Sequence, residues 1–415
     1  RYKEVGRWRL AEDASVQLVE RYPREPVTVG AMRWLLMLWT SEEMGWTRLQ
    51  DFSYEQSEVT IDGDVARANV ERTRELLQRP EGMERLRELS RSPNSPLLIQ
   101  PVGGDVTVSG RTGHREEESD LWHQKASRLV DMLRRIDPAA FDQPGVQFTY
   151  AALLRHRQQY DASDEIYRGF FNEADPLWTR TARGEVWALH GPVQSPKPVI
   201  RCRTVATPPV LDGVLGDACW EATEEVYLAA APSNADERDE FIGSNRIDES
   251  GSMDARAESD SERALVMLTH DEKYLYVAAS VPRRDGLPDD PVTLSGREHD
   301  ADLTGFDRLS LQFDVDRDYA TWYRFDMDSR AQIRDACWID QSWNPEWYVA
   351  GRGDTRRWTI EAAIPWEALG PAAPGPRETW SIGIVRIMPG VGVQSWTHPA
   401  GSVPRGEAMG LLRFE

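Results

Sequence analysis

The spacing of apolar residues changes near residue 190, and this change most limits the folds that the chain can adopt. Before it, apolar side chains recur every three or four residues, as on one face of a helix. After it, they alternate with polar side chains over short segments, as in half-buried strands. Pro192, Pro196 and Pro198 form a stiff polar stretch between the two patterns. We therefore predict an α-helical domain over 1–190, a Pro-rich linker over 191–198 and a β-domain over 199–415.

The first pattern predicts an array of helices joined by short turns, which pack as antiparallel pairs. The pair at 146–159 and 162–171, followed by Pro176, loosely resembles a tetratricopeptide repeat. No strict period of about 34 residues supports a repeat, so a plain helical domain is the alternative. The Gly- and charge-rich stretch 101–120 is expected to be a loop. Helices are expected at 7–22, 26–39, 65–77, 82–89, 120–136, 146–159, 162–171 and 177–189.

The second pattern predicts an antiparallel β-sandwich. The segments 264–269 and 274–281 flank a polar turn, as in two paired strands. Further alternating segments lie at 309–313, 358–361 and 382–384. The stretch 233–263 is acidic and poor in apolar residues, which indicates a surface insertion. The fold class is therefore α plus β in several domains, with a helical repeat-like array before an antiparallel β-sandwich.

Charge and hydropathy exclude two classes of partner. The 49 basic and 69 acidic residues give a formal net charge of −20, which repels nucleic acid and anionic membranes. No apolar run approaches the ~18 residues that span a bilayer, because Arg33 interrupts the longest candidate, 32–39. We therefore expect no nucleic-acid partner and no transmembrane segment.

Signatures of catalysis are absent from the sequence. The seven histidines form no His-Glu-x-x-His motif, and the three cysteines show no Cys-x-x-Cys spacing, which argues against a zinc site. No Gly-x-Ser-x-Gly motif is present, and the glycines at 351 and 353 lack the third glycine of a dinucleotide loop. We predict that the protein is not an enzyme.

Motifs spread over the β-half carry a resemblance to a known family. They are PVLDG at 209–213, HDEKYLYV at 270–277, FDRLSLQFD at 306–314, YRF at 323–325, WTIEAAIPW at 358–366 and GLL at 410–412. In this order and spacing, residues 199–415 resemble a family 9 carbohydrate-binding module, a DOMON-like β-sandwich. The resemblance implies a non-catalytic module that holds a terminal sugar between two tryptophans, with calcium in structural sites.

The sugar-binding positions of that family match this chain in part. The family's sugar-contacting arginine corresponds to Arg324, and its sugar-contacting glutamine corresponds to Val385. The two stacking tryptophans correspond to Thr304 and Val403, which have no aromatic ring. Stacking on a pyranose would therefore need other tryptophans.

Other residues near Arg324 are candidates for the ligand site. We expect Arg324 to anchor hydroxyls or a carboxylate, with Asp307, Trp322 and Trp343 shaping the pocket. Trp343 is expected to be exposed because Asn-Pro, a turn signal, follows it. Tryptophans within the family motifs are expected in the core: Trp220, Trp347, Trp358, Trp366 and Trp380.

Asp314, Asp316 and Asp318 alternate along the chain and form a possible calcium site. They are not part of a calcium-binding helix-loop-helix loop, because its sixth and twelfth positions would be Tyr319 and Phe325. A solvated hairpin tip is the interpretation we favour for these three aspartates. Asp300, Asp302 and Asp307 form a second acidic group, for which calcium follows from the resemblance alone.

These observations predict a non-catalytic protein that binds the end of a glycan or polysaccharide, with a helical adaptor domain that contacts a protein partner. A secreted, periplasmic or cell-surface location fits this function, although the chain shows no signal peptide at Arg1. One alternative is a structural or scaffold protein whose sugar site has been lost. Another is a haem-binding electron-transfer subunit in which Met388 supplies an axial ligand.

Overall fold

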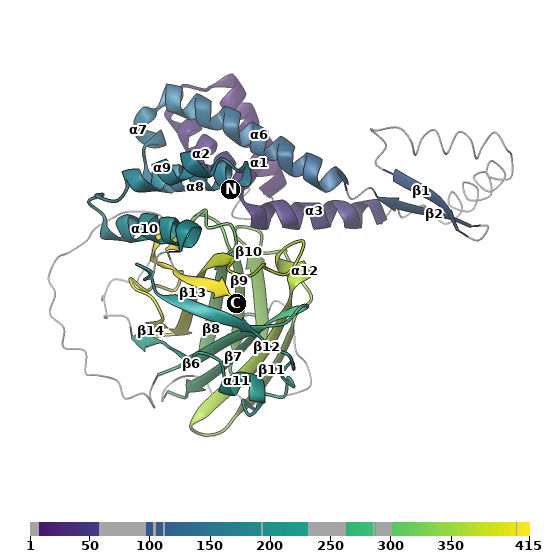
Figure 1. The fold of residues 1–415 in the computed structure, drawn as a ribbon, viewed down its shortest axis with the longest axis vertical. Helices are drawn as coiled ribbons and strands as arrows, with labels where there is room; N and C mark the ends of the chain where they lie inside the picture. Colours follow the sequence, from purple (N-terminus) through teal and green to yellow (C-terminus); the bar gives the residue numbers. More distant parts are fainter. Residues whose placement is uncertain are drawn as a thin grey trace.

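The helices lie in the N-terminal half of the chain and most strands lie in the C-terminal half (Figure 1). The computed structural model describes residues 8–57, 97–102, 105–110, 113–191, 194–230, 263–284, 287, 301–403 and 405–415. The helices predicted at 65–77 and 82–89 lie outside the described residues, as does nearly all of the acidic stretch 233–263.

Most expected helices that fall on described residues are present. α10, for example, begins at Pro176, where Asp175 Oδ1 accepts a hydrogen bond from the Leu177 amide at 2.8 Å. It ends before Gly191, whose φ of 61° favours glycine. A repeat is not shown by this arrangement. The helices are α1 (Trp8–Arg21), α2 (Pro26–Thr40), α3 (Glu42–Ser57), α6 (Gly113–Ile136), α7 (Pro138–Phe141), α8 (Pro144–His156), α9 (Tyr160–Gly169) and α10 (Pro176–His190).

The prediction of a loop over 101–120 was wrong. Strands β1 (Leu97–Val102) and β2 (Asp105–Gly110) pair there as an antiparallel hairpin that projects beside α3 and α6 (Figure 1). In the sequence, a Gly-Gly dipeptide between two short segments is also a hairpin signal, and the prediction did not use it. The charged residues that follow belong to α6, and arginine and glutamate both have a high helix propensity.

The strands of the C-terminal half form one mixed sheet that nearly closes on itself, in a sandwich-like arrangement. The neighbours run in the order β10-β9-β8-β13-β15-β3-β6-β7-β12-β11, with β4, β5 and β14 paired at the side. The strands are β3 (Val199–Thr204), β4 (Val226–Tyr227), β5 (Ala229–Ala230), β6 (Leu265–His270), β7 (Tyr274–Pro282), β8 (Arg308–Asp314), β9 (Tyr323–Asp328), β10 (Ile333–Cys337), β11 (Tyr348–Gly353), β12 (Arg357–Pro365), β13 (Thr379–Met388), β14 (Gly392–Ser395) and β15 (Gly410–Phe414).

The prediction of a purely antiparallel sheet was wrong at one strand. β3 runs parallel to both of its neighbours, β15 and β6, and so joins the two halves of the sheet. The chain reaches β3 from the helices and not through a hairpin, so no tight turn imposes an antiparallel direction. Short helices α11 (Ala218–Glu221), α12 (Trp366–Leu369) and η2 (Gly406–Ala408) complete this half.

The core between the two halves of the sheet is rich in aromatic residues. Trp380 and Phe414 pack edge to face, with ring centroids 4.9 Å apart. The predicted burial of the motif tryptophans is confirmed, since each is at most 4% exposed: Trp220, Trp347, Trp358, Trp366 and Trp380.

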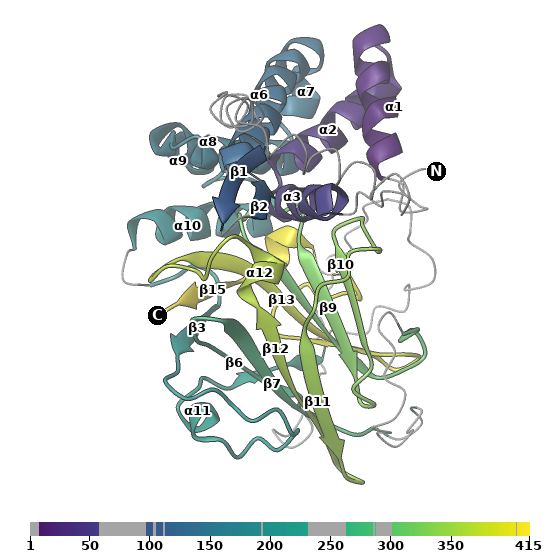
Figure 2. The same ribbon diagram turned by 90° about the vertical axis from the view of Figure 1, so that its right-hand side faces the viewer.

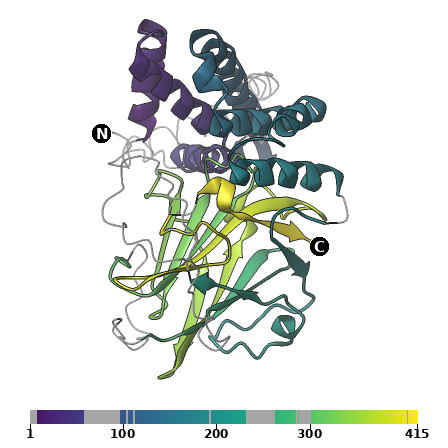
Figure 3. The same cartoon turned by 90° about the vertical axis from the view of Figure 1, so that its left-hand side faces the viewer.

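The helices and the sheet also pack against each other. Figures 2 and 3 show α3 and α10 lying along the top of the strands. Met44 Sδ of α3 lies 3.6 Å from Cys337 Sγ of β10, and Trp8 Nε1 donates to Asp340 Oδ2 at 3.0 Å. Side chains of both halves therefore belong to one continuous apolar cluster. Within the part of the chain described here, no helix has the length and apolar character needed to cross a membrane.

Candidate functional site

One outer surface of the sheet carries polar side chains from three neighbouring strands. In β8, Leu309, Leu311 and Phe313 point into the core, so the residues between them point outward. The strand register then places Ser310 beside Asp326 of β9, and Asp326 beside Arg334 of β10. We name this surface the polar face. It consists of Arg308, Ser310, Gln312, Arg324, Asp326 and Arg334.

Asp326 is the buried centre of the polar face. Arg324 binds it through two nitrogens, with Nε 2.8 Å from Oδ1 and Nη2 2.7 Å from Oδ2. Arg334 Nη2 donates to Oδ2 at 3.2 Å, and the Ser310 hydroxyl donates to Oδ1. The side chain of Asp326 is 0% exposed, whereas those of Arg324 and Arg334 are 24% and 36% exposed. Asp326 therefore holds two guanidinium groups in fixed positions that solvent can reach.

Two buried polar atoms of the same face have no partner. Gln312 Nε2 donates to Ser310 Oγ at 2.6 Å, but Gln312 Oε1 accepts no hydrogen bond. Arg308 Nη1 donates to the carbonyl oxygens of Leu303 and Thr304 at 3.1 and 3.3 Å, while Arg308 Nε has no partner. Burial and the neighbouring arginines hold the pKa of Arg308 below its usual value, despite the carboxylate of Asp326. Buried polar groups without partners are rare in folded proteins and often belong to binding sites.

Three of the four positions that match the family's sugar site, Arg324, Val385 and Thr304, lie on or next to the polar face. Arg324 belongs to the polar face, Val385 pairs with Ser310 in the register, and the Thr304 carbonyl accepts from Arg308. Val385 is buried with Ile387, Val393 and Ala400, so it offers no polar contact. Val403 is 62% exposed. Neither Thr304 nor Val403 supplies an aromatic ring at this surface.

Asp307, another predicted ligand residue, lies inside the β-domain. It is 4% exposed, and its Oδ1 accepts from Arg386 Nε at 2.8 Å. Arg386 Nη2 and Trp358 Nε1 both donate to Oδ2, the second at 3.2 Å. Both carboxylate oxygens of Asp307 accept hydrogen bonds from core residues, so we do not include Asp307 in the proposed site.

The predicted exposure of Trp343 was wrong. Its ring is 6% exposed and stacks on Tyr323, with centroids 4.8 Å apart and an interplanar angle of 28°. Phe325 packs edge-on against it at 5.5 Å. The turn lies before Trp343, at Gln341 and Ser342, and the indole packs into the core. Trp322 is half-buried and lies next to Tyr323 in the sequence.

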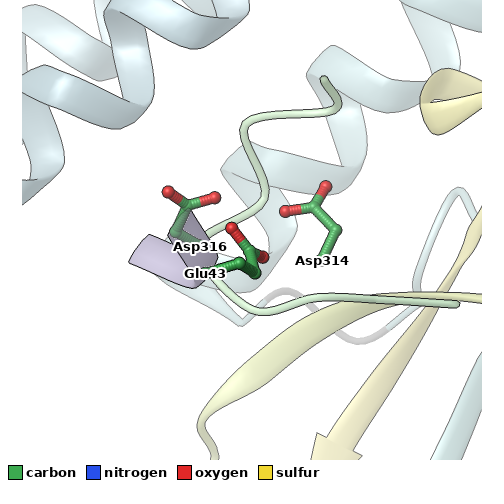
Figure 4. A group of neighbouring side chains, drawn as sticks. All are labelled: Glu43, Asp314 and Asp316. Carbon is green, nitrogen blue, oxygen red and sulfur yellow. The ribbon is translucent and has the colours of Figure 1, made fainter. Parts of the chain in front are cut away.

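The favoured interpretation of Asp314, Asp316 and Asp318 as a solvated hairpin tip was also wrong, because helices cover this connection between β8 and β9. Each of the three aspartates is buried. Glu43 of α3 joins them, and its Oε1 accepts from the Val315 amide at 2.7 Å. One oxygen each of Glu43, Asp314 and Asp316 lies within 4.8 Å of the others, and Figure 4 shows these three side chains together. We name Glu43, Asp314, Asp316 and Asp318 the carboxylate cluster.

Burial and mutual repulsion oppose full ionisation of the carboxylate cluster. Burial, together with the neighbouring negative charges, raises the pKa of Glu43, Asp314 and Asp318 well above the usual values. Burial also raises the pKa of Asp316, but hydrogen bonding and charge from His156 outweigh this and lower it. His156 Nε2 lies 3.3 Å from Asp316 Oδ2, and its Nδ1 lies 2.8 Å from Glu42 Oε1. Protons or a bound cation must therefore balance the rest of the charge.

Residues of the polar face other than Arg324 were not found from the sequence. The pairs Ser310-x-Gln312 and Arg324-x-Asp326 each place two polar side chains on one side of a strand, which was the available signal. The sequence does not show that β8 and β9 pair in the register that joins these pairs. Glu43 and His156 gave no signal, because their partners lie far away along the chain.

Solved structures that resemble this protein each match about half of the chain. No protein-family model matches the chain, and no curated protein sequence is significantly similar to it. A family 9 carbohydrate-binding module from Caldicellulosiruptor kristjanssonii, solved with cellotriose and with glucose, shares 13% identity. The two structures have TM-scores of 0.34 and 0.33 and cover 52% of this chain and 94% and 95% of their own. A Bacteroides uniformis protein proposed to bind carbohydrate has 10% identity and a TM-score of 0.37, covering 53% of this chain and 100% of its own. The function proposed below rests on the residues of this chain.

Proposed function

We propose that the protein is a non-catalytic carbohydrate-binding protein and that its polar face binds the saccharide. The observation that carries the proposal is Arg324, a partly exposed guanidinium group held by two bonds to the buried Asp326. Saccharide sites in proteins combine such fixed charged groups with amides that bond hydroxyls. Gln312, with a free carbonyl oxygen, supplies the amide. The motifs that resemble family 9 modules support the same surface, since the matching arginine is Arg324.

A screen of the labelled full-length chain against an array of neutral and acidic oligosaccharides tests this proposal. We expect binding to a subset of glycans, and we expect Arg324→Ala to abolish it. Arg168→Ala is the matched control, because Arg168 is an exposed arginine that pairs with Asp164 on α9. Binding that survives in the Arg324 variant would exclude the polar face as the site.

Calcium is a second part of the proposal. By this account Glu43, Asp314 and Asp316 hold the ion, since carboxylate oxygens are the ligands that calcium prefers. The ion would neutralise buried charge between α3 and the β8–β9 connection. The saccharide contacts proposed above do not depend on it, because they involve other residues.

Thermal unfolding tests the calcium proposal. We expect the unfolding midpoint of the parent chain to rise with added calcium and to fall with a chelator, because an ion bound only to the folded state stabilises it. Glu43→Gln should remove most of this response, and Glu20→Gln, an exposed substitution on α1, should leave it unchanged. If the parent midpoint is the same with calcium and with chelator, protons alone balance the cluster.

A structural or scaffold role is the second candidate function. It is favoured by Thr304 and Val403, which provide no stacking surface where the family has tryptophans. A protein partner of the helical half and an extracellular or periplasmic location also remain predictions. Haem binding through Met388, which is buried at the end of β13, stays a prediction that a Soret absorbance measurement would decide.

A further inference from the structure

We infer that the polar face selects an acidic saccharide, one whose sugar carries a carboxylate, over its neutral counterpart. This inference rests on the proposed function and names the ligand class of the same surface. It follows from the balance of charge at the face and from the two polar atoms that the protein leaves without partners.

The balance of charge favours an anion. Arg308, Arg324 and Arg334 lie on the face, and among the described residues Asp326 is the one carboxylate that forms an ion pair with any of them. Asp302 is exposed at the edge and accepts from the Thr304 amide at 2.9 Å. Counting only the part of the chain that the structure describes, three arginines thus lie near two carboxylates, within a chain whose formal net charge is −20. A local excess of positive charge attracts anions that the rest of the surface repels.

Arg308 carries a buried positive charge that favours a ligand with a carboxylate. It is 9% exposed, and the bonds of its guanidinium group go to main-chain carbonyl oxygens, while its Nε has no partner. Among the described residues, no carboxylate forms an ion pair with it. A buried charge without a counter-ion is costly, and a ligand carboxylate would supply one. Arg324 and Arg334 extend the same cationic surface to solvent.

Gln312 adds a requirement for a hydroxyl group. The Ser310 hydroxyl donates its proton to Asp326, so it can only accept from Gln312, which fixes Nε2 on that side. Gln312 Oε1 therefore faces away from Ser310 as a buried acceptor without a donor. A ligand that offers both a carboxylate and hydroxyl groups matches this set, and uronic acids combine the two. An anion without hydroxyl groups would leave Gln312 unsatisfied.

The absence of tryptophans at Thr304 and Val403 agrees with this ligand class. Neutral sugars depend on aromatic stacking for much of their affinity, because their hydroxyls exchange water for protein at little net gain. Ionic hydrogen bonds to a carboxylate are about twice as strong as neutral ones. A charged ligand could therefore be held without two stacking rings.

Calorimetric titration of the full-length chain with matched sugars tests the inference. The pairs are glucuronate with glucose and galacturonate with galactose, each as the monosaccharide and as short oligomers, at low and high salt. We expect at least one uronate to bind about tenfold more tightly than its neutral partner, with the difference reduced at high salt. Arg334→Gln should remove about tenfold of uronate affinity and reduce neutral-sugar affinity by less, so that the preference for the uronate falls, whereas Arg168→Gln should change neither affinity.

Each other outcome contradicts a stated part of the account. Equal affinity for the two members of every pair would overturn the inference and leave the proposed function intact. No binding of either member would overturn both. Acetate that competes as well as the uronate would show a simple anion site and would overturn the saccharide class. Circular dichroism of each variant separates loss of binding from loss of folding.

Discussion

Asp307 and Asp326 both pair with arginines, but their surroundings give them different roles. Asp307 lies between Arg386, which is 0% exposed, and the indole of Trp358, so its pair closes the core. Asp326 is equally buried, but Arg324 and Arg334 extend from it toward solvent. The same ion pair is thus structural in one position and suited to ligand binding in the other. Exposure of the arginine distinguishes the two.

Asp307→Asn should destabilise the protein strongly. It removes the counter-ion of a fully buried guanidinium, which costs about 3–5 kcal/mol in comparable buried pairs. The free energy of unfolding, measured by urea denaturation, reports the loss. Asp13→Asn, an exposed change on α1, is the control and should leave stability unchanged. A variant as stable as the parent would show that Asp307 does not anchor the core.

Trp343→Ala should also act on stability and leave saccharide binding intact in the folded fraction. The indole fills the space against Tyr323 and Phe325, and removing a buried tryptophan costs about 3–5 kcal/mol. Urea denaturation and glycan binding measured on the same preparation separate the two effects. Loss of saccharide binding with unchanged stability would show instead that Trp343 belongs to the binding site.

At the scale of elements, the periodicity of the sequence predicted local structure better than the contacts between elements. The segment 264–269 was expected as a strand and is β6 within one residue, and 26–39 was expected as a helix and is α2. The parallel direction of β3 and the contact of Glu43 with Val315 were missed. Hydrophobic spacing reports which side of an element is buried, but not which element covers it. For the same reason, the sequence did not predict the strand register that brings the residues of the polar face together.

The contact between α8 and the β8–β9 connection should depend on pH through His156. The carboxylates of Glu42 and Asp316 overcome the effect of burial and raise the pKa of His156 to about 10. A histidine with a raised pKa adds stability that is complete below about pH 6.5 and is lost as the pH rises toward 10.

His156→Gln should therefore flatten the pH dependence of stability. We expect the variant to lose on the order of 3 kcal/mol relative to the parent near pH 6, and less as the pH approaches about 10. Urea denaturation across this range measures both slopes. The control is His190→Gln, at an exposed position of α10. Parallel curves for parent and variant would mean that His156 does not carry its charge in the folded protein.

At the scale of the whole molecule, the helices and the sheet form one packed structure. Thr321 of the β-half donates to Glu43 at 3.0 Å, and Arg155 of α8 donates to Glu185 of α10 at 2.6 Å, beside Arg317. Trp34 stacks on Trp338 with centroids 6.0 Å apart. These buried contacts make independent movement of the two halves costly, because separation would expose charged and aromatic groups.

The full-length chain should unfold in one transition, and residues 199–415 alone should be less stable. Without the helices, the buried carboxylates after β8 lose their covering, and we expect the unfolding midpoint to fall by about 10 °C or more. Differential scanning calorimetry of both proteins measures this. Two separate transitions in the full chain, one of them matching the isolated β-half, would show that the halves are independent domains.

The most direct test of the central claim is the heat of saccharide binding to the full-length chain and to its Arg324→Ala variant under one set of conditions. The account predicts saturable binding of at least one saccharide by the parent and none by the variant, with both proteins folded. Equal binding by parent and variant, or no saccharide binding by the parent, would contradict it.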